Sequence, residues 1–178
     1  MKILFMGTPD FAKTSLEALH NNGFEIVGVV TNPDKQSGRG MKFNESDVKK
    51  FAIEKGFKIY QPEKVKQNNE FINTLKEIKP DVICVVAYGK ILPKEILNIP
   101  EKGCINLHAS LLPKYRGAAP IQWAVLNGDK TTGVSTMYMN EKMDEGDIIL
   151  QEETEIGKYE TTGELWDRLS ILRSKFAC

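Results

Sequence analysis

The chain of 178 residues carries 24 basic and 24 acidic residues, so its formal net charge at pH 7 is zero. This balance excludes a global field that would attract nucleic acid, and any such contact has to come from a local basic patch. The hydrophobic share of 41% and the charged share of 27% are ordinary for a globular protein. We expect one domain over residues 1–178, large enough to be stable without disulfides or metals.

The cysteines and the N-terminus both indicate a reducing compartment. Cys84 and Cys104 lie within apolar runs, where a small buried thiol is the simplest interpretation, and Cys178 closes the chain. The apolar run in MKILFMG is too short for a secretory signal, and no stretch approaches the about 20 residues of a membrane span. We therefore expect a cytoplasmic protein without membrane contacts, and we take it to be a monomer.

Short apolar runs alternate with helical periodicity through the first part of the chain. The runs predict strands over residues 2–6, 25–31, 57–60, 81–87 and 103–108. The helical patterns predict a helix that starts after Thr8 as its N-cap, and further helices over residues 46–54, 68–78 and 92–100. His20, in the last turn of the first helix, is expected to be solvated. Residues 32–45 have no apolar period, which predicts a long loop.

The last part of the chain has a different pattern. A helix over residues 118–128 is followed by two alternating segments, 132–140 and 147–156, which predict antiparallel strands, and by a final helix from Gly163. The unbroken apolar run at 81–87 is typical of a strand covered on both faces in a parallel sheet. Together these patterns predict an α/β fold with an open, mostly parallel sheet and a Rossmann-like first half. Ligands of such sheets bind beyond the carboxyl ends of the strands.

Asn106 and His108 end one of these predicted strands, where polar side chains are unexpected. Residues i and i+2 of a strand share a face, so the amide and the imidazole can point into one cleft. The acidic turn MDEGD carries Asp144, Glu145 and Asp147, and one of these carboxylates could orient an imidazole for proton transfer. An amide beside them could stabilise an oxyanion. The amide, the imidazole and a carboxylate together fit acyl transfer without a covalent intermediate. On the pattern alone, a structural histidine and an ordinary acidic turn remain open.

Other chemical motifs are scarce. The sequence has no H-E-x-x-H, no cysteine pair at ligand spacing and no phosphate-binding P-loop, so we expect no metal site. Ser110 lies outside a G-x-S-x-G elbow, which makes a serine nucleophile a weak interpretation. The segment 34–50 is rich in lysine and arginine, and it is open whether it forms a solvated loop or a mobile arm that contacts phosphates.

Four strings of this sequence, taken in order, resemble one family closely. They are MGTPDFA, AYGKILP, INLHASLLPKYRGAAPIQWAVLNGDKTTGVS and MDEGDIIL. They place residues 2–165 beside the methionyl-tRNA formyltransferase family, and the block over 105–135 is the most distinctive part. The wider group of folate-dependent formyltransferases shares only the Asn–His–Asp set and the SLLP turn. The resemblance therefore implies a Rossmann-like formyltransferase fold and a specific reaction.

That reaction is transfer of a formyl group from 10-formyltetrahydrofolate to the α-amine of initiator methionyl-tRNA. The resemblance implies that Asn106 stabilises the oxyanion, His108 relays a proton from the amine to N10 of the folate, and Asp144 positions His108. It implies a folate site formed by Ser110, Leu111, Leu112, Pro113, Ala87, Tyr88, Gly89 and Ile91. It also implies a tRNA site formed by Lys35, Arg39 and Lys42.

The chain departs from this family at its C-terminal end. The family has a second, β-barrel domain that helps to hold tRNA, and the tail SILRSKFAC differs from what usually follows. We therefore expect a catalytic domain that stops before the barrel, which affects tRNA use more than folate binding. Two alternatives stay open. One is formylation of a small amine, such as an amino-sugar nucleotide or glycinamide ribonucleotide, and the other is a folate- or RNA-binding fragment without turnover.

Overall fold

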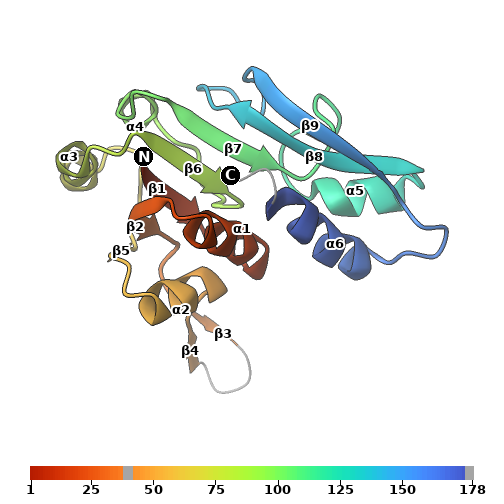
Figure 1. The fold of residues 1–178 in the computed structure, drawn as a ribbon, viewed down its shortest axis with the longest axis horizontal. Helices are drawn as coiled ribbons and strands as arrows, with labels where there is room; N and C mark the ends of the chain where they lie inside the picture. Colours follow the sequence, from red (N-terminus) through yellow and green to blue (C-terminus); the bar gives the residue numbers. More distant parts are fainter. Residues whose placement is uncertain (38–41, 175–178) are drawn as a thin grey trace.

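The computed structural model describes residues 1–37 and 42–174, and a seven-stranded sheet runs through this part of the chain in the order β5-β2-β1-β6-β7-β8-β9 (Figure 1). Its parallel strands are β1 (Lys2–Gly7), β2 (Glu25–Val30), β5 (Ile59–Tyr60), β6 (Val82–Val86) and β7 (Cys104–His108). Two antiparallel strands extend the sheet, β8 (Thr131–Tyr138) and β9 (Ile148–Glu155). The predicted α/β class, with an open and mostly parallel Rossmann-like sheet, is confirmed.

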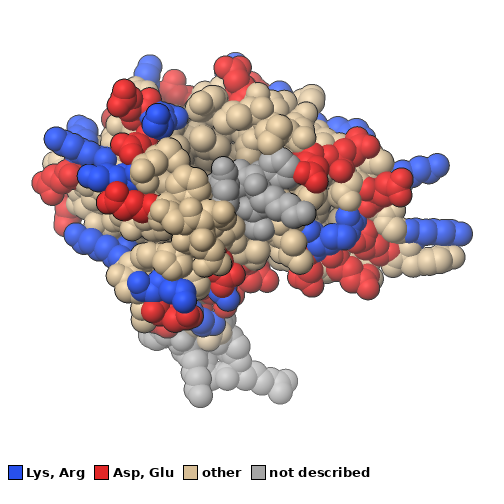
Figure 2. All heavy atoms as spheres, in the orientation of Figure 1, with Lys and Arg blue, Asp and Glu red and all other residues tan. Residues whose placement is uncertain are grey.

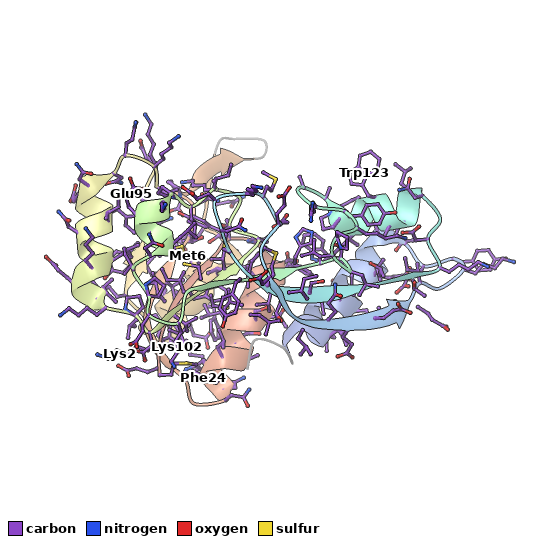
Figure 3. The ribbon with its side chains drawn as sticks, turned by 90° about the horizontal axis from the view of Figure 1, so that it is seen from above. Lys2, Met6, Phe24, Glu95, Lys102 and Trp123 are labelled. Atoms are coloured by element: carbon purple, nitrogen blue, oxygen red, sulfur yellow. The ribbon has the colours of Figure 1, made fainter. Side chains whose placement is uncertain are left out.

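Helices cover both faces of the parallel part. Those on the parallel part are α1 (Asp10–Asn21), α2 (Asp47–Glu54), α3 (Asn69–Ile78) and α4 (Lys94–Leu97). Two further helices, α5 (Pro120–Leu126) and α6 (Thr162–Ser174), pack beside β8. Ile3 and Phe5 of β1 pack in one cluster with α1 and α2, whereas Leu4 and Met6 pack in another with α3 and α4. Met6 accordingly lies in the interior (Figure 3) and is fully buried. Burial on both faces explains why these strands have continuous apolar runs.

A third cluster joins the antiparallel part of the sheet to the parallel part. Leu165 and Leu169 of α6 are fully buried, and they pack with Val134 of β8 and Phe11 of α1. The rings of Phe11 and Trp166 add a contact with centroids 4.5 Å apart. Because α6 touches both α1 and β8, it fixes the two parts of the sheet relative to each other.

Three local predictions were wrong. Pro9, not Thr8, is the N-cap of α1, because the Thr8 hydroxyl accepts hydrogen bonds from Asn32 instead. The strand predicted over residues 57–60 is limited to Ile59–Tyr60 at the edge of the sheet. His20 is half-buried rather than solvated, because its ring packs edge-on against Phe57 with centroids 5.3 Å apart.

The segment 32–45 also differs from the predicted long loop. Strands β3 (Lys35–Ser37) and β4 (Lys42–Asn44) pair antiparallel in a separate two-stranded sheet. Figure 1 shows this hairpin projecting from the body of the protein beside α2. A half-buried strand is predicted from alternating apolar residues, and the sequence of these two strands has no such alternation. Lys35 and Lys42 lie in the two strands, and Arg39 lies outside the described residues.

Two other local predictions were confirmed. The helix predicted over residues 46–54 is α2, and its N-cap Ser46 accepts a hydrogen bond from the backbone N–H of Lys49. Cys84 and Cys104 are buried and form no disulfide, and burial raises the pKa of the Cys104 thiol to about 12. Cys178 lies outside the described residues.

Within the part of the chain that the structure describes, no helix is long and apolar enough to cross a membrane. Basic and acidic side chains are interspersed over the face shown in Figure 2, in keeping with a net charge of zero.

We expect Gly133→Ala to lower the free energy of unfolding by about 1–3 kcal/mol, the usual cost of overpacking. A Cβ at Gly133 of β8 would lie 2.0 Å from the Glu152 carbonyl oxygen and 2.6 Å from Leu111 Cδ2. The measurement is urea denaturation of both proteins. Gly163→Ala in α6 is the control, because a Cβ there meets nothing closer than 4.0 Å. Equal stability of the two variants would contradict the prediction.

Candidate active site

The carboxyl ends of β1, β6 and β7 meet at one edge of the sheet. The register pairs Met6 with Val85 and Val85 with Asn106, which brings the three strand ends side by side. Strand order reverses here, because β2 and β6 lie on opposite sides of β1. A cavity of about 570 Å³ lies at this edge. Seven of the predicted site residues line it: Ala87, Tyr88, Gly89, Ile91, Asn106, His108 and Asp144.

His108 ends β7 and is 7% exposed. Its Nε2 lies 2.8 Å from the carbonyl oxygen of Tyr115. A carbonyl can only accept, so we assign the hydrogen of the neutral imidazole to Nε2. Nδ1 then has a free lone pair and lies 3.6 Å from Asp144 Oδ2. This arrangement lets Nδ1 take up a proton, because the imidazolium that forms would face a carboxylate.

Asp144 is fixed by two donors from different elements. Its Oδ1 accepts a hydrogen bond from Asn106 Nδ2 at 3.2 Å, and its Oδ2 accepts one from the backbone N–H of Gly117 at 2.8 Å. The Asp144 backbone has a φ of 51°, in the left-handed region that aspartate tolerates better than most residues. Asn106 retains its second Nδ2 hydrogen for a ligand in the cavity. The three side chains predicted from the sequence therefore meet at one place, with Asn106 hydrogen-bonded to Asp144 and His108 Nδ1 3.6 Å from the same carboxylate.

The loop over residues 87–91 forms one wall of the cavity. Ala87 and Gly89 have positive φ values of 45° and 77°, and Ile91 exposes 67% of its surface. Tyr88 points into the core at 2% exposure, and burial raises its pKa to about 12. Its phenol therefore stays neutral and plays no acid–base part near pH 7. Lys90 Nζ anchors the loop by donating to the carbonyl oxygens of Pro62 and Glu63.

The lining of the cavity suits a partly apolar ligand. Met137 of β8, Met139 just after this strand, Ile121 and Trp166 line it together with the polar group. Such a pocket, apolar with a few convergent polar groups, is typical of a small-molecule site. Among the described residues, no group of three His, Cys, Asp or Glu side chains could hold a metal ion.

The family profile described as "Formyl transferase" matches residues 1–176 of this chain. The chain belongs to the formyl transferase family. The methionyl-tRNA formyltransferase of Caldanaerobacter subterraneus subsp. tengcongensis is 56% identical over 172 residues, which are 97% of this chain and 56% of that protein. That of Alkaliphilus oremlandii is 57% identical over 97% of this chain and 55% of its own length. The chain thus spans about half the length of these relatives.

Solved structures support the fold of this formyl transferase. A phosphoribosylglycinamide formyltransferase from Bacillus halodurans has a TM-score of 0.81 at 21% identity, covering 98% of this chain and 90% of its own. Its counterpart from Anaplasma phagocytophilum has a TM-score of 0.83 at 23% identity, covering 98% and 82%. At this level of identity the likeness concerns the fold alone.

The SLLP turn of this formyl transferase does not line the cavity, although its four residues were predicted to bind folate. Ser110 and Leu112 are buried, and the Ser110 hydroxyl donates to the carbonyl oxygen of Lys114 at 2.6 Å. Ser135 of β8 accepts a hydrogen bond from the Leu112 N–H and donates to the Ser110 carbonyl. Leu111 and Pro113 are likewise missing from the lining. The turn is hydrogen-bonded to Lys114, the residue before Tyr115, through the Ser110 hydroxyl and the Leu111 carbonyl oxygen.

Two functional groups were not predicted from the sequence, the carbonyl of Tyr115 and the N–H of Gly117. Both are backbone groups, which carry no side-chain signal. Tyr115 has a φ of 53° and Gly117 a φ of 83°, so both residues have a left-handed backbone conformation. A glycine in KYRG was the one visible hint, because glycine adopts a positive φ most readily.

Proposed function

We propose that this chain transfers the formyl group of 10-formyltetrahydrofolate to the α-amine of initiator methionyl-tRNA. The observation that carries the proposal is Asp144, which accepts hydrogen bonds from Asn106 and Gly117 and faces His108 Nδ1 at the cavity. This group supplies both a proton acceptor and an amide donor within one site. The relatives that are more than 50% identical are named methionyl-tRNA formyltransferases, which supports methionyl-tRNA as the acceptor of a formyl group. The donor, 10-formyltetrahydrofolate, is proposed from the resemblance.

In the proposed reaction, the amine nitrogen attacks the formyl carbon and a C–N bond forms. The second Nδ2 hydrogen of Asn106 stabilises the negative charge that develops on the formyl oxygen. The proton lost by the amine moves to His108 Nδ1, where Asp144 stabilises the imidazolium. The bond from the formyl carbon to N10 of the folate then breaks, and His108 returns the proton to N10. No net charge accumulates, and the two histidine protonation states alternate once per turnover.

The formyl donor would occupy the part of the cavity next to the loop over residues 87–91. The exposed Ile91 and backbone groups of Ala87 and Gly89 line this part of the cavity and can contact a flat heteroaromatic ring. The SLLP turn would act on this site indirectly, because it supports the carbonyl that orients His108. Donor binding therefore depends on the loop, and chemistry depends on the Asn–His–Asp group.

The test is formyl transfer from radiolabelled 10-formyltetrahydrofolate, with methionyl-tRNA, glycinamide ribonucleotide and an amino-sugar nucleotide as acceptors in parallel. We expect formylmethionyl-tRNA as the product and no turnover of the two small amines. Turnover of a small amine without tRNA would assign the chain to a different branch of the family. Folate binding without any turnover would show a fragment that lacks something needed for chemistry.

We expect Arg39→Ala to raise KM for methionyl-tRNA by about tenfold or more, because removal of a phosphate contact of a nucleic-acid complex typically weakens binding at low salt. Arg39 lies between the hairpin strands that contain Lys35 and Lys42. The KM for the formyl donor should not change. Steady-state kinetics with each substrate varied in turn give both values. Equal loss for both substrates would contradict a tRNA role for the basic segment.

A further inference from the structure

Asn32 joins three loops at the carboxyl edge of the sheet, although it does not line the cavity. It follows β2 and is half-buried. Its Nδ2 donates to Thr8 Oγ1 at 3.0 Å and to the carbonyl oxygen of Tyr88 at 2.9 Å. The backbone carbonyl oxygen of Asn32 accepts a hydrogen bond from Gln61 Nε2 at 2.9 Å. One residue thus connects the turn after β1, the wall of the cavity and the segment after β5.

The same chain of hydrogen bonds continues to the base of the β3–β4 hairpin. Gln61 Nε2 also donates to Asp34 Oδ1 at 3.0 Å, and Asp34 accepts a hydrogen bond from Lys49 Nζ of α2. Lys49 pairs in addition with Glu45 at 3.1 Å. Asp34 immediately precedes β3 and Glu45 immediately follows β4, so Lys49 holds both ends of the hairpin.

Asp34 and Lys49 are both charged near neutral pH. The hydrogen bond from Lys49 lowers the pKa of Asp34, and the bond from Gln61 lowers it further. The hydrogen bond to Asp34 raises the pKa of Lys49 in turn. The side chains of Lys49 and Asp34 are only 15% and 22% exposed, so water and salt screen this pair less than a surface pair.

We propose that Asn32 is a positioning residue that holds the base of the basic hairpin at a fixed place relative to the 87–91 wall of the donor cavity. The inference rests on the proposed function, in which the wall contacts the formyl donor and the hairpin contacts tRNA. The physical reason for the inference is that two bound substrates react fast only when the elements that bind them are held at a fixed distance and orientation. The Nδ2 group of Asn32 supplies the link on the cavity side, and Gln61 supplies the link on the hairpin side.

Asn32→Asp tests the link with minimal change of shape, because a carboxylate has no hydrogens for Thr8 or for the Tyr88 carbonyl. Asn68→Asp is the matched control. It adds the same charge at the N-cap of α3, where the aspartate oxygen still accepts the Phe71 N–H. Gln61→Met breaks the second link without adding charge. It keeps the test informative where Asn32→Asp does not fold.

The first readout is KM at saturating formyl donor, with whole methionyl-tRNA and with a short methionyl-adenosine acceptor that cannot reach the hairpin. We expect Asn32→Asp and Gln61→Met to raise KM for the tRNA about fivefold to tenfold, as for loss of one hydrogen bond. The KM for the short acceptor should stay at the wild-type value, and Asn68→Asp should resemble the wild type. A purely structural role would change both acceptors equally, and that result would overturn the inference.

The second readout needs no activity. Backbone hydrogen exchange over residues 35–37 and 42–44 should be faster in Asn32→Asp and Gln61→Met than in Asn68→Asp, while exchange in β1 and β6 stays unchanged. A wild-type protein that does not formylate tRNA would refute the proposed function, and hydrogen exchange would then decide the inference by itself. Unchanged exchange in the hairpin strands would overturn it.

Discussion

Replacing His108 by alanine lowers kcat for formyl transfer by an expected factor of about 10²–10⁴, the usual contribution of general acid–base catalysis. The reason is that Nδ1, which lies 3.6 Å from Asp144, is the atom proposed to take the proton of the attacking amine. Single-turnover transfer to methionyl-tRNA measures the chemical step directly. Calorimetric binding of tetrahydrofolate should be retained, because the proposed donor site is the loop over residues 87–91.

The alanine variant also leaves the Tyr115 carbonyl without its donor, so a second variant separates catalysis from folding. In His108→Gln the amide nitrogen can still donate to Tyr115, but no atom at the Nδ1 position accepts a proton. We expect this variant to be as inactive as His108→Ala. The control is His20→Gln, which changes the other histidine of the chain, remote from the cavity. Substantial activity in His108→Gln would show that His108 only shapes the site.

Asn106→Ala should lower kcat by about 10²–10³, the effect of removing one oxyanion donor. The side chain donates one Nδ2 hydrogen to Asp144, and in the proposed reaction the other stabilises the developing charge on the formyl oxygen. A rise in KM for the formyl donor should be small by comparison, since the charge exists only in the transition state. Asn22→Ala, at the exposed end of α1, is the control for loss of an amide.

A double-mutant cycle distinguishes the two roles of Asn106. If Asn106 acted only by holding Asp144, its removal in an Asp144→Ala background would have no further effect on kcat. We expect a further decrease of at least about tenfold, because the oxyanion loses its donor whether or not Asp144 is present. Single-turnover rates of the four proteins complete the cycle. No additional decrease in the double variant would restrict Asn106 to a positioning role.

Periodicity predicted most of the fold, because an element buried on one or two faces has a regular pattern of apolar residues in the sequence, and this pattern is its record. The apolar strands β1, β2, β6 and β7 and the helices between them follow from that record. The hairpin β3–β4 leaves no such record, since no alternating apolar face was visible over residues 32–45. The mistaken Thr8 cap has a similar origin. Its hydroxyl accepts from Asn32, 24 residues away, and local sequence cannot show such a partner.

The candidate site shows the same division. Asn106 and His108 could be placed on one strand face from their spacing, and the resemblance added Asp144 from a distant turn. The contacts that make the group chemically specific come from Tyr115 and Gly117, through backbone atoms set by positive φ values. The SLLP turn was assigned to folate by resemblance, and this assignment stays a prediction; the structure shows that its serine and second leucine are buried.

The sequence by itself determined the class of fold, the formyl transferase family and the three side chains that meet at the cavity. These depend on local spacing, strand alternation and short strings of residues. Only the tertiary structure decided which nitrogen of His108 is free, how Asp144 is fixed, and that Asn32 connects the cavity wall to the hairpin. Each of those depends on atoms that are far apart in the sequence and become neighbours only in the folded protein.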